Sequence, residues 1–134
     1  MATEDSPNSP IEIPDDAVDL IRQADWITVF SGAGMSADSG VPTFRDAHTA
    51  LWERYSAEDL ASVDAWHHDP ALVWSWYHWR TRLVRQAQPN AGHRALADLG
   101  RHSAVMVVTQ NVDDLHERAG STVISHLHGS LFAP

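Results

Sequence analysis

Glycines that follow a short apolar run are the first residues of this sequence with a spacing that suits chemistry. Residues 26–30, W-I-T-V-F, suit a buried strand, and Gly32, Gly34 and Ala37 follow in the pattern G-x-G-x-x-A. Glycine lets the backbone come close to a diphosphate, and the amides that open the next helix then point at the anion. The pattern therefore indicates a dinucleotide site, although glycines after an apolar run are often only a turn.

The residues after this loop should end the following helix early. Residues 39–45, S-G-V-P-T-F-R, place a glycine and a proline close behind the loop and finish on an aromatic and a cation. The helix of an ordinary dinucleotide-binding domain runs on for several turns. We therefore expect the chain to fold back over whatever the glycines hold, and an ordinary Rossmann oxidoreductase is disfavoured.

Polar side chains follow a second apolar run. Residues 103–109, S-A-V-M-V-V-T, predict a strand buried on both faces of a parallel sheet, and Gln110, Asn111 and Asp113 come directly after it. Ligands of open α/β sheets bind at the carboxyl ends of the strands, so these side chains are candidates for ligand contact. Asparagine and aspartate also cap helices, and that simpler role is compatible with the first.

A histidine follows a third predicted strand, at residues 123–127. We expect this strand to lie beside the strand of the glycine loop, which would bring His128 to the site. Imidazole titrates near neutral pH and suits a general base. A histidine at a strand end is usually an ordinary surface residue, and because the chain has nine histidines, position alone singles out His128.

A phenol and a guanidinium share one face of a long predicted helix. The helix begins at Asp69-Pro70 and should run to about Gln86, with Tyr77 and Arg80 three residues apart. Both groups can donate hydrogen bonds to a carboxylate. The alternative is an aromatic face packed on the core, with Arg80 in solvent.

The remaining signals complete an α/β pattern. Helices should follow Pro14, run from Ser56 to about Ala65, and cover residues 90–99 and 113–119. Three strands with helical crossovers predict a partial Rossmann-like, doubly wound parallel sheet with an inserted helical segment at about residues 46–88. Residues 1–12 predict a disordered tail.

Composition disfavours several classes of function. The net charge is −9, and the nine basic residues are all arginine and form no stripe, so nucleic-acid binding is disfavoured. No apolar run approaches the roughly 20 residues of a membrane span, and no secretory signal is recognisable, so we expect no membrane contact and a cytoplasmic location. Cysteine is absent, which leaves no thiolate zinc site. A metal site on His67, His68 and His78 is disfavoured because adjacent histidines rarely chelate one ion well.

The motifs resemble those of the sirtuins, the NAD-dependent protein-lysine deacylases. The loop is similar to the sirtuin pattern G-A-G-x-S-x-x-S-G-I-P-x-F-R, and residues 109–116 are similar to T-Q-N-I-D-x-L-H, each with valine for isoleucine. Residues 128–129 resemble the family's H-G motif. The resemblance implies NAD as cofactor, acylated lysine of a protein or peptide as substrate, and transfer of the acyl group to ADP-ribose with release of nicotinamide.

The resemblance also implies a role for each matching residue. His128, Asn111 and Asp113 form the implied catalytic set, with the last two lining the pocket for the nicotinamide ribose and carboxamide. The implied cofactor-binding residues are Gly32, Ala33, Gly34, Ser36, Ser39, Gly40, Pro42, Thr43, Phe44, Arg45, Trp52, Gln110, Asn111, Val112 and Asp113. His126 departs from the family, which often has glutamate there.

The implied substrate-binding residues are Ala57, Tyr77 and Arg80. The pattern Y-x-x-R resembles the sirtuin branch that removes succinyl, malonyl and glutaryl groups, and a small residue at Ala57 would leave room for the acyl chain. The guanidinium and the phenol would then meet the carboxylate at its tip.

The resemblance reaches only the N-terminal portion of the family's catalytic domain. Residues 13–134 are expected to form an incomplete catalytic domain, without the four-cysteine zinc ribbon and the second Rossmann half of complete members. Zinc is expected in those members, but its cysteine ligands are absent here. The leading hypothesis is a truncated deacylase, with an unknown complementing chain. The alternative is a non-catalytic remnant that binds NAD or ADP-ribose.

Overall fold

Three parallel strands form one sheet, in the order β1-β2-β3. A computed structural model of the chain describes residues 12–42 and 55–133, without the side chains of residues 57 and 58. The strands are β1 (Trp26–Ser31), β2 (Ala104–Thr109) and β3 (Val123–His126). The last residue of β2 pairs with the last residue of β1 and of β3. The carboxyl ends of all three strands therefore meet at one edge of the sheet.

This strand order corrects one expectation. β3 was predicted to lie beside β1, but β2 lies between them. Each strand pairs with the next one in the sequence, which is the common arrangement in parallel sheets, where consecutive elements are usually neighbours. His128 therefore follows an edge strand of this sheet, two residues beyond the last residue of β3.

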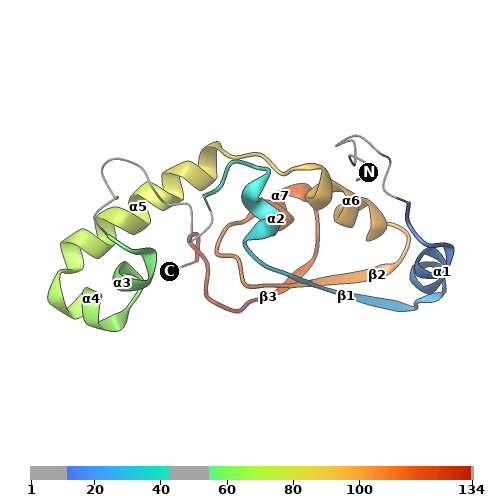
Figure 1. The fold of residues 1–134 in the computed structure, drawn as a ribbon, viewed down its shortest axis with the longest axis horizontal. Helices are drawn as coiled ribbons and strands as arrows, with labels where there is room; N and C mark the ends of the chain where they lie inside the picture. The colour runs from blue at the N-terminus through green and yellow to red at the C-terminus, as the bar shows by residue number, and fades with distance from the viewer. Residues whose placement is uncertain (1–11, 43–54, 134) are drawn as a thin grey trace, which may run out of the picture.

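The helices that pack on the sheet lie on one of its faces. Figure 1 shows α2 (Gly34–Ala37), α6 (Ala91–Leu99) and α7 (Leu115–Ala119) on the same side of the strands. Beneath them Val107 and Leu115 are fully buried, whereas on β1 Trp26 is 64% and Phe30 63% exposed. The prediction that the second strand is buried on both faces is wrong for the described residues, because Val107 and Thr109 of β2 are buried whereas Met106 and Val108 are only partly buried.

The inserted segment forms three helices that extend away from the sheet. These are α3 (Ala57–Leu60), α4 (Val63–His68) and α5 (Pro70–Gln86), shown in green and yellow in Figure 1. Leu60 and Trp76 form a small core there, with Leu72, Tyr77 and Trp79 packed against it. α5 begins and ends where the sequence predicts, and Asp69 accepts a hydrogen bond from the backbone amide of Leu72.

One predicted helix of this segment is two. Ser56 accepts a hydrogen bond from the amide of Asp59 as a cap should, but that helix ends at Leu60 rather than near Ala65. Ser62 then starts α4 by accepting from the amide of Ala65, and its hydroxyl donates to the carbonyl of Asp59. A serine side chain competes with the helix for these backbone groups, which breaks the helix at this point.

The other predicted helices are present. The helix after Pro14 is α1 (Asp15–Gln23), in which no residue is fully buried. α6 follows the cap Asn90 as predicted. α7 begins two residues later than expected and ends at Gly120, whose φ of +101° is the left-handed conformation that glycine adopts without strain. No helix in the described part of the chain is long and apolar enough to cross a bilayer.

Candidate functional site

Side chains at the carboxyl edge of the sheet form a buried hydrogen-bond network. The hydroxyl of Ser31 donates to the hydroxyl of Thr109 over 2.8 Å, which joins the ends of β1 and β2. The backbone amide of Asn111 then donates to the same Thr109 oxygen over 3.0 Å. Because buried polar groups without partners are costly, these bonds fix the path of the chain as it leaves both strands.

The glycine loop lies open beside this network. A Cβ built on Gly32 or Gly34 would meet no atom within 4 Å, so the packing of the described chain does not itself require glycine at either position. Gly40 differs, since its φ of +77° is one that other residues rarely adopt. The helix α2, which begins at Gly34, has a single turn. The prediction that the helix after the glycine loop ends early is therefore confirmed. The loop therefore presents bare backbone to a space that none of the described residues occupies.

Asn111 and Ser36 join the loop to the segment after β2. The side-chain amide of Asn111 donates to the carbonyl of Gly32 over 3.0 Å and to the hydroxyl of Ser36 over 3.2 Å. The Ser36 hydroxyl in turn donates to Asp113 over 2.8 Å. All three of these side chains are at least nine-tenths buried. The two predicted motifs are thus one structural unit.

Neither pocket residue is the helix cap that the simpler role predicted. The N-cap of α7 is Asp114, and its side chain makes no cap hydrogen bond. Asp113, one residue earlier, accepts a hydrogen bond from the backbone amide of Leu115 over 3.1 Å. Its other carboxylate oxygen accepts from the Ser36 hydroxyl, and the side chain of Asn111 bonds the glycine loop.

Asn90 holds the other side of the loop, a contact that sequence reasoning missed. Its side-chain amide donates to the carbonyl of Met35 over 2.7 Å and to the Ser39 hydroxyl over 3.0 Å. Its side-chain oxygen at the same time accepts from the amides that start α6, at Gly92 and His93. The cap was predicted, but a cap signal does not say which loop lies above it.

Two buried histidines lie beneath the network, and neither was predicted as a site residue. His116 makes a 2.9 Å hydrogen bond with the Ser31 hydroxyl, and its ring meets that of His93 edge to face at 4.8 Å. His93 Nε2 and His116 Nδ1 are buried without a hydrogen-bond partner. Burial lowers the pKa of both rings below 6.5, and in His93 the neighbouring His116 adds to this effect. Burial therefore disfavours the protonated form of both rings.

His126 lies at the end of β3 and bonds two parts of the site. One ring nitrogen lies 2.7 Å from the carbonyl of Asn111, and the other lies 2.6 Å from a carboxylate oxygen of Glu117. Burial works to lower the pKa of His126, but the hydrogen bonds to Glu117 and Asn111 outweigh it, and the pKa is raised above 6.5. The carboxylate that holds His126 comes from α7.

His128 is exposed, in the turn that follows β3. The strand ends at His126, one residue earlier than predicted. Behind the turn, the backbone amide of Leu131 donates to the carbonyl of Val112 over 2.9 Å, so the chain returns to the segment after β2. The imidazole of His128 is thus accessible to a ligand beside that segment.

Tyr77 and Arg80 pack around Trp76 on α5. The Tyr77 ring meets the Trp76 ring edge to face at 4.9 Å, and the Arg80 guanidinium lies over the same ring at 4.9 Å. Burial lowers the pKa of Arg80, while Tyr77 and Asp113 act to raise it. Arg80 is therefore half-buried and within electrostatic reach of the pocket segment. Of the alternative prediction, the aromatic face packed on a core is confirmed, whereas the arginine in solvent is wrong.

Some predicted site residues are not placed. Thr43, Phe44, Arg45 and Trp52 lie outside the described residues, as does the side chain of Ala57. Among the placed residues, Gln110 is exposed, and its backbone amide donates to the carbonyl of Ser31 over 2.9 Å. Within residues 12–42 and 55–133, no three histidine, aspartate or glutamate side chains are grouped to hold a metal ion.

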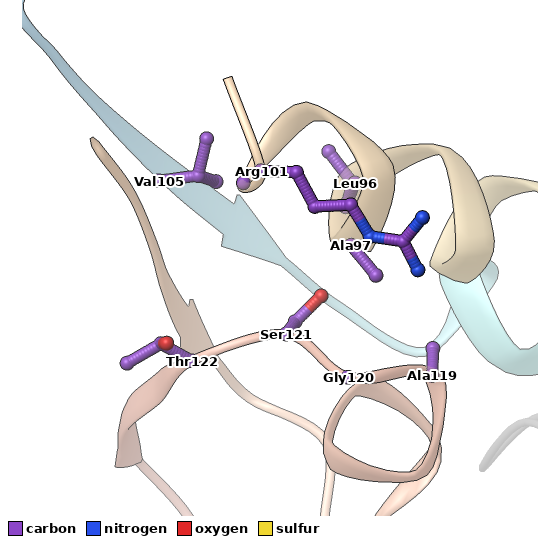
Figure 2. Close-up of a pocket in the computed structure, with 9 residues that line it drawn as sticks. Leu96, Ala97, Arg101, Val105, Ala119, Gly120, Ser121 and Thr122 are labelled. Atoms are coloured by element: carbon purple, nitrogen blue, oxygen red, sulfur yellow. The ribbon is translucent and has the colours of Figure 1, made fainter. Parts of the chain in front are cut away.

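A small cavity lies near the start of β2, at the opposite end of this strand from the hydrogen-bond network. It has a volume of about 130 Å³ and lies between the end of α6 and the turn after α7 (Figure 2). Arg101, Val105 and Ser121 are among its lining residues. None of the predicted site residues lines it, so it is separate from the candidate site.

A parallel sheet, an open glycine loop after its first strand and a buried polar network at its carboxyl edge define an α/β protein of the Rossmann-like, nucleotide-binding class. The comparisons with known proteins narrow this class. A family model described as the Sir2 family matches residues 32–133. The chain belongs to this family.

The relatives are proteins about twice as long. A NAD-dependent protein deacylase of Mycolicibacterium paratuberculosis is 58% identical over 106 residues, which are 79% of this chain and 45% of that protein. A crystal structure of a Sir2 homologue in complex with NAD has a TM-score of 0.81 at 48% identity, over 89% of this chain and 46% of the other. A Sir2 protein bound to an acetylated peptide has a TM-score of 0.69 at 30% identity, over 83% and 43%. The chain spans about half the length of the curated relatives it matches.

Proposed function

We propose that these residues form the glycine-loop half of an NAD-dependent protein-lysine deacylase. The observation that carries the proposal is the buried network of Ser36, Asn111 and Asp113, which holds the open loop against the carboxyl edge of the sheet. A relative of this fold at 48% identity is a complex with NAD. Because this chain spans about half the length of these relatives, the activity is proposed for these residues as part of a complete protein of that kind.

The residues present fit NAD. At positions 32 and 34, any residue other than glycine would place a side chain in the space beside the loop. With glycine there, the backbone is free to approach a diphosphate. Asn111 and Asp113 would lie on the nicotinamide side, with Gln110 near a ribose hydroxyl. When bound, NAD supplies the ribose carbon that accepts the acyl oxygen as nicotinamide leaves.

The protein's own residues would then position the ribose and move a proton. His128 is proposed to take the proton of a ribose hydroxyl, since it is exposed and carries an imidazole. By the resemblance to sirtuins, Phe44 would shield the reacting sugar from water, and Arg45 would pair with the diphosphate. Asn111 keeps its position because its amide is bound to the loop on two sides.

The acyl group is proposed to lie along α5. Arg80 and Tyr77 would meet a carboxylate at the tip of a succinyl, malonyl or glutaryl chain, with Ala57 beside it. In support, the Arg80 guanidinium is half-buried, stacked on Trp76 and oriented by neighbours rather than free in solvent. A relative of this fold is bound to an acetylated peptide, so an acylated lysine is the proposed substrate in either case.

The test uses a hybrid protein, in which this segment replaces the matching segment of the M. paratuberculosis relative. We expect nicotinamide release that depends on an acyl-lysine peptide, measured by chromatography. A matched peptide with unmodified lysine is the control. Hydride transfer to a substrate, or release that is independent of the peptide, would contradict the proposal.

A second candidate is a non-catalytic remnant that binds NAD or ADP-ribose weakly or not at all. It is favoured by the exposed side chains of Trp26 and Phe30 on β1, which no described element covers. Titration calorimetry of the 134-residue chain separates the cases. Micromolar binding favours a functional half-site, whereas a flat trace favours a remnant.

A further inference from the structure

Arg118 connects the acyl-binding helix to the segment that carries Asp113. It lies in α7, and its two terminal nitrogens donate to the carbonyls of Ala87 and Val84 over 2.9 Å each. Its Nε lies 3.1 Å from a carboxylate oxygen of Asp114. The Arg118 side chain is 29% exposed and that of Asp114 31%, so water screens the group only in part.

These contacts suit arginine and no other side chain. The guanidinium donates to two carbonyls at the end of α5. One is the carbonyl of Val84 in the last turn, which also accepts from the backbone amide of Ala87, and the other is the carbonyl of the C-cap residue Ala87 itself. A planar guanidinium can serve several acceptors at once, whereas the ammonium of lysine is a single point. The positive charge also lies at the negative end of the α5 dipole. The end of α5 is thereby fixed on α7.

The position of this end matters because of what the helix carries. Arg80 lies one turn before Val84, roughly 6 Å along the axis. Figure 1 shows that α5 extends away from the sheet, with its last turn nearest to the strands. α7 begins two residues after Asp113, whose charge acts on Arg80. Arg118 therefore links the helix that carries Arg80 to the helix that follows Asp113.

We propose that Arg118 is a positioning residue for acyl selection: its three contacts set where Tyr77 and Arg80 lie relative to Asp113. The inference rests on the proposed function and names a residue that acts through Arg80 rather than on the substrate. Loss of Arg118 lets the end of α5 move, so Arg80 no longer reaches the substrate carboxylate in a fixed geometry. An acetyl group, which has no carboxylate, is affected less.

The experiment measures kcat/KM for desuccinylation and for deacetylation in the hybrid protein. Arg118→Ala is expected to lower the ratio of the two about tenfold, the value of one charge-assisted hydrogen bond. Arg118→Lys should recover part of the ratio, since it keeps the charge but not the fork. The matched control is Arg101→Ala, an exposed arginine at the end of α6 that pairs with Asp98; it should leave the ratio unchanged.

A second background shows whether the effect passes through Arg80. In Arg80→Met protein, the further change Arg118→Ala should not alter the ratio, because the group that it positions is gone. Thermal melts of every variant identify those that merely unfold.

Each outcome has one meaning. An active hybrid in which Arg118→Ala lowers both activities equally overturns the inference, while the deacylase function stands. A parent hybrid without peptide-dependent nicotinamide release overturns the proposed function itself. A parent that deacetylates but does not desuccinylate removes the acidic-acyl assignment and this inference with it.

Discussion

The hydroxyl of Ser36 donates a 2.8 Å hydrogen bond to the carboxylate of Asp113, 77 residues further along the chain. Both side chains are at least nine-tenths buried. The bond joins the only turn of α2 to the start of α7, so the open glycine loop is held by the segment expected to contact the nicotinamide. Binding at one motif and the stability of the other are therefore coupled.

Ser36→Ala tests this bond. The change leaves a buried carboxylate oxygen of Asp113 with one donor fewer, which should lower the free energy of unfolding by about 1–3 kcal/mol. Chemical denaturation at pH 7 measures it. Ser75→Ala is the control, because the Ser75 hydroxyl bonds a carbonyl on an exposed face of α5 and its loss should change stability by about 0.5 kcal/mol or less. Equal losses of unfolding free energy in the two variants would contradict the prediction that the buried bond stabilises the fold more than an exposed one.

Asn111→Asp tests the second connection to the loop. It keeps the size of the side chain but replaces an amide donor by an acceptor opposite the carbonyl of Gly32. It also places a charge near Asp113 in a buried site. We expect a loss of roughly 2 kcal/mol or more in stability, and at least tenfold weaker NAD binding in the hybrid protein by calorimetry. Gln110→Glu, on an exposed neighbour, controls for the added charge in the stability measurement; a similar loss there would point to net charge rather than to the bond.

Local signals predicted the elements, and longer-range contacts escaped prediction. The bounds of α5 and α6 follow from Asp69 and Asn90, because a cap acts within one turn. The strands of the sheet follow from apolar runs. The order of the strands does not follow from these runs, since the residue types of β3 do not indicate which strand lies beside it. That is why His128 was placed next to the strand of the glycine loop.

The parts of the site divide in the same way. The motif residues Ser36, Asn111 and Asp113 were all identified, because their spacing resembles a family pattern. His93 and His116 were not, although both lie in helices at positions with apolar neighbours. A histidine in such a position reads as an ordinary surface or core residue until its partner is known, and the partner here is 23 residues away in the other helix. Arg118 was missed for the same reason, since its acceptors are carbonyls, which every residue has.

The buried histidines predict how stability depends on pH. Burial lowers the pKa of His93 and His116 in the folded state, so the unfolded chain binds more protons below pH 6.5. Their contribution is present above pH 6.5 and is lost as pH falls toward the folded pKa values. His126 has the opposite sign: its pKa is raised, so its contribution is present below 6.5 and is lost as pH rises through the folded value.

Denaturation of the 134-residue chain at pH 5.5 and pH 7.5 checks these signs. His126→Gln should enlarge the loss of stability on acidification, because the opposing group is gone. His116→Gln should reduce that loss, whatever its effect on stability at pH 7.5. Asp113 and Glu117 act to raise the pKa of His116, which tempers the effect without reversing it. A pH dependence unchanged in both variants would locate the titrating groups elsewhere.

Acyl choice gives the last prediction, which concerns Arg80 and Tyr77. In the hybrid protein, Arg80→Met should lower kcat/KM for desuccinylation about ten- to a hundredfold, since a charge-assisted hydrogen bond contributes roughly 1.5–3 kcal/mol. Deacetylation should fall much less, because an acetyl group offers no carboxylate. Tyr77→Phe should show the same selectivity more mildly, since it removes one donor and keeps the ring that packs on Trp76. Methionine retains much of the apolar contact of Arg80 with Trp76, so the variant separates charge from packing. If Arg80→Met lowers both activities equally, Arg80 supports the helix and the acidic-acyl preference fails, while the assignment to NAD-dependent deacylation is unaffected.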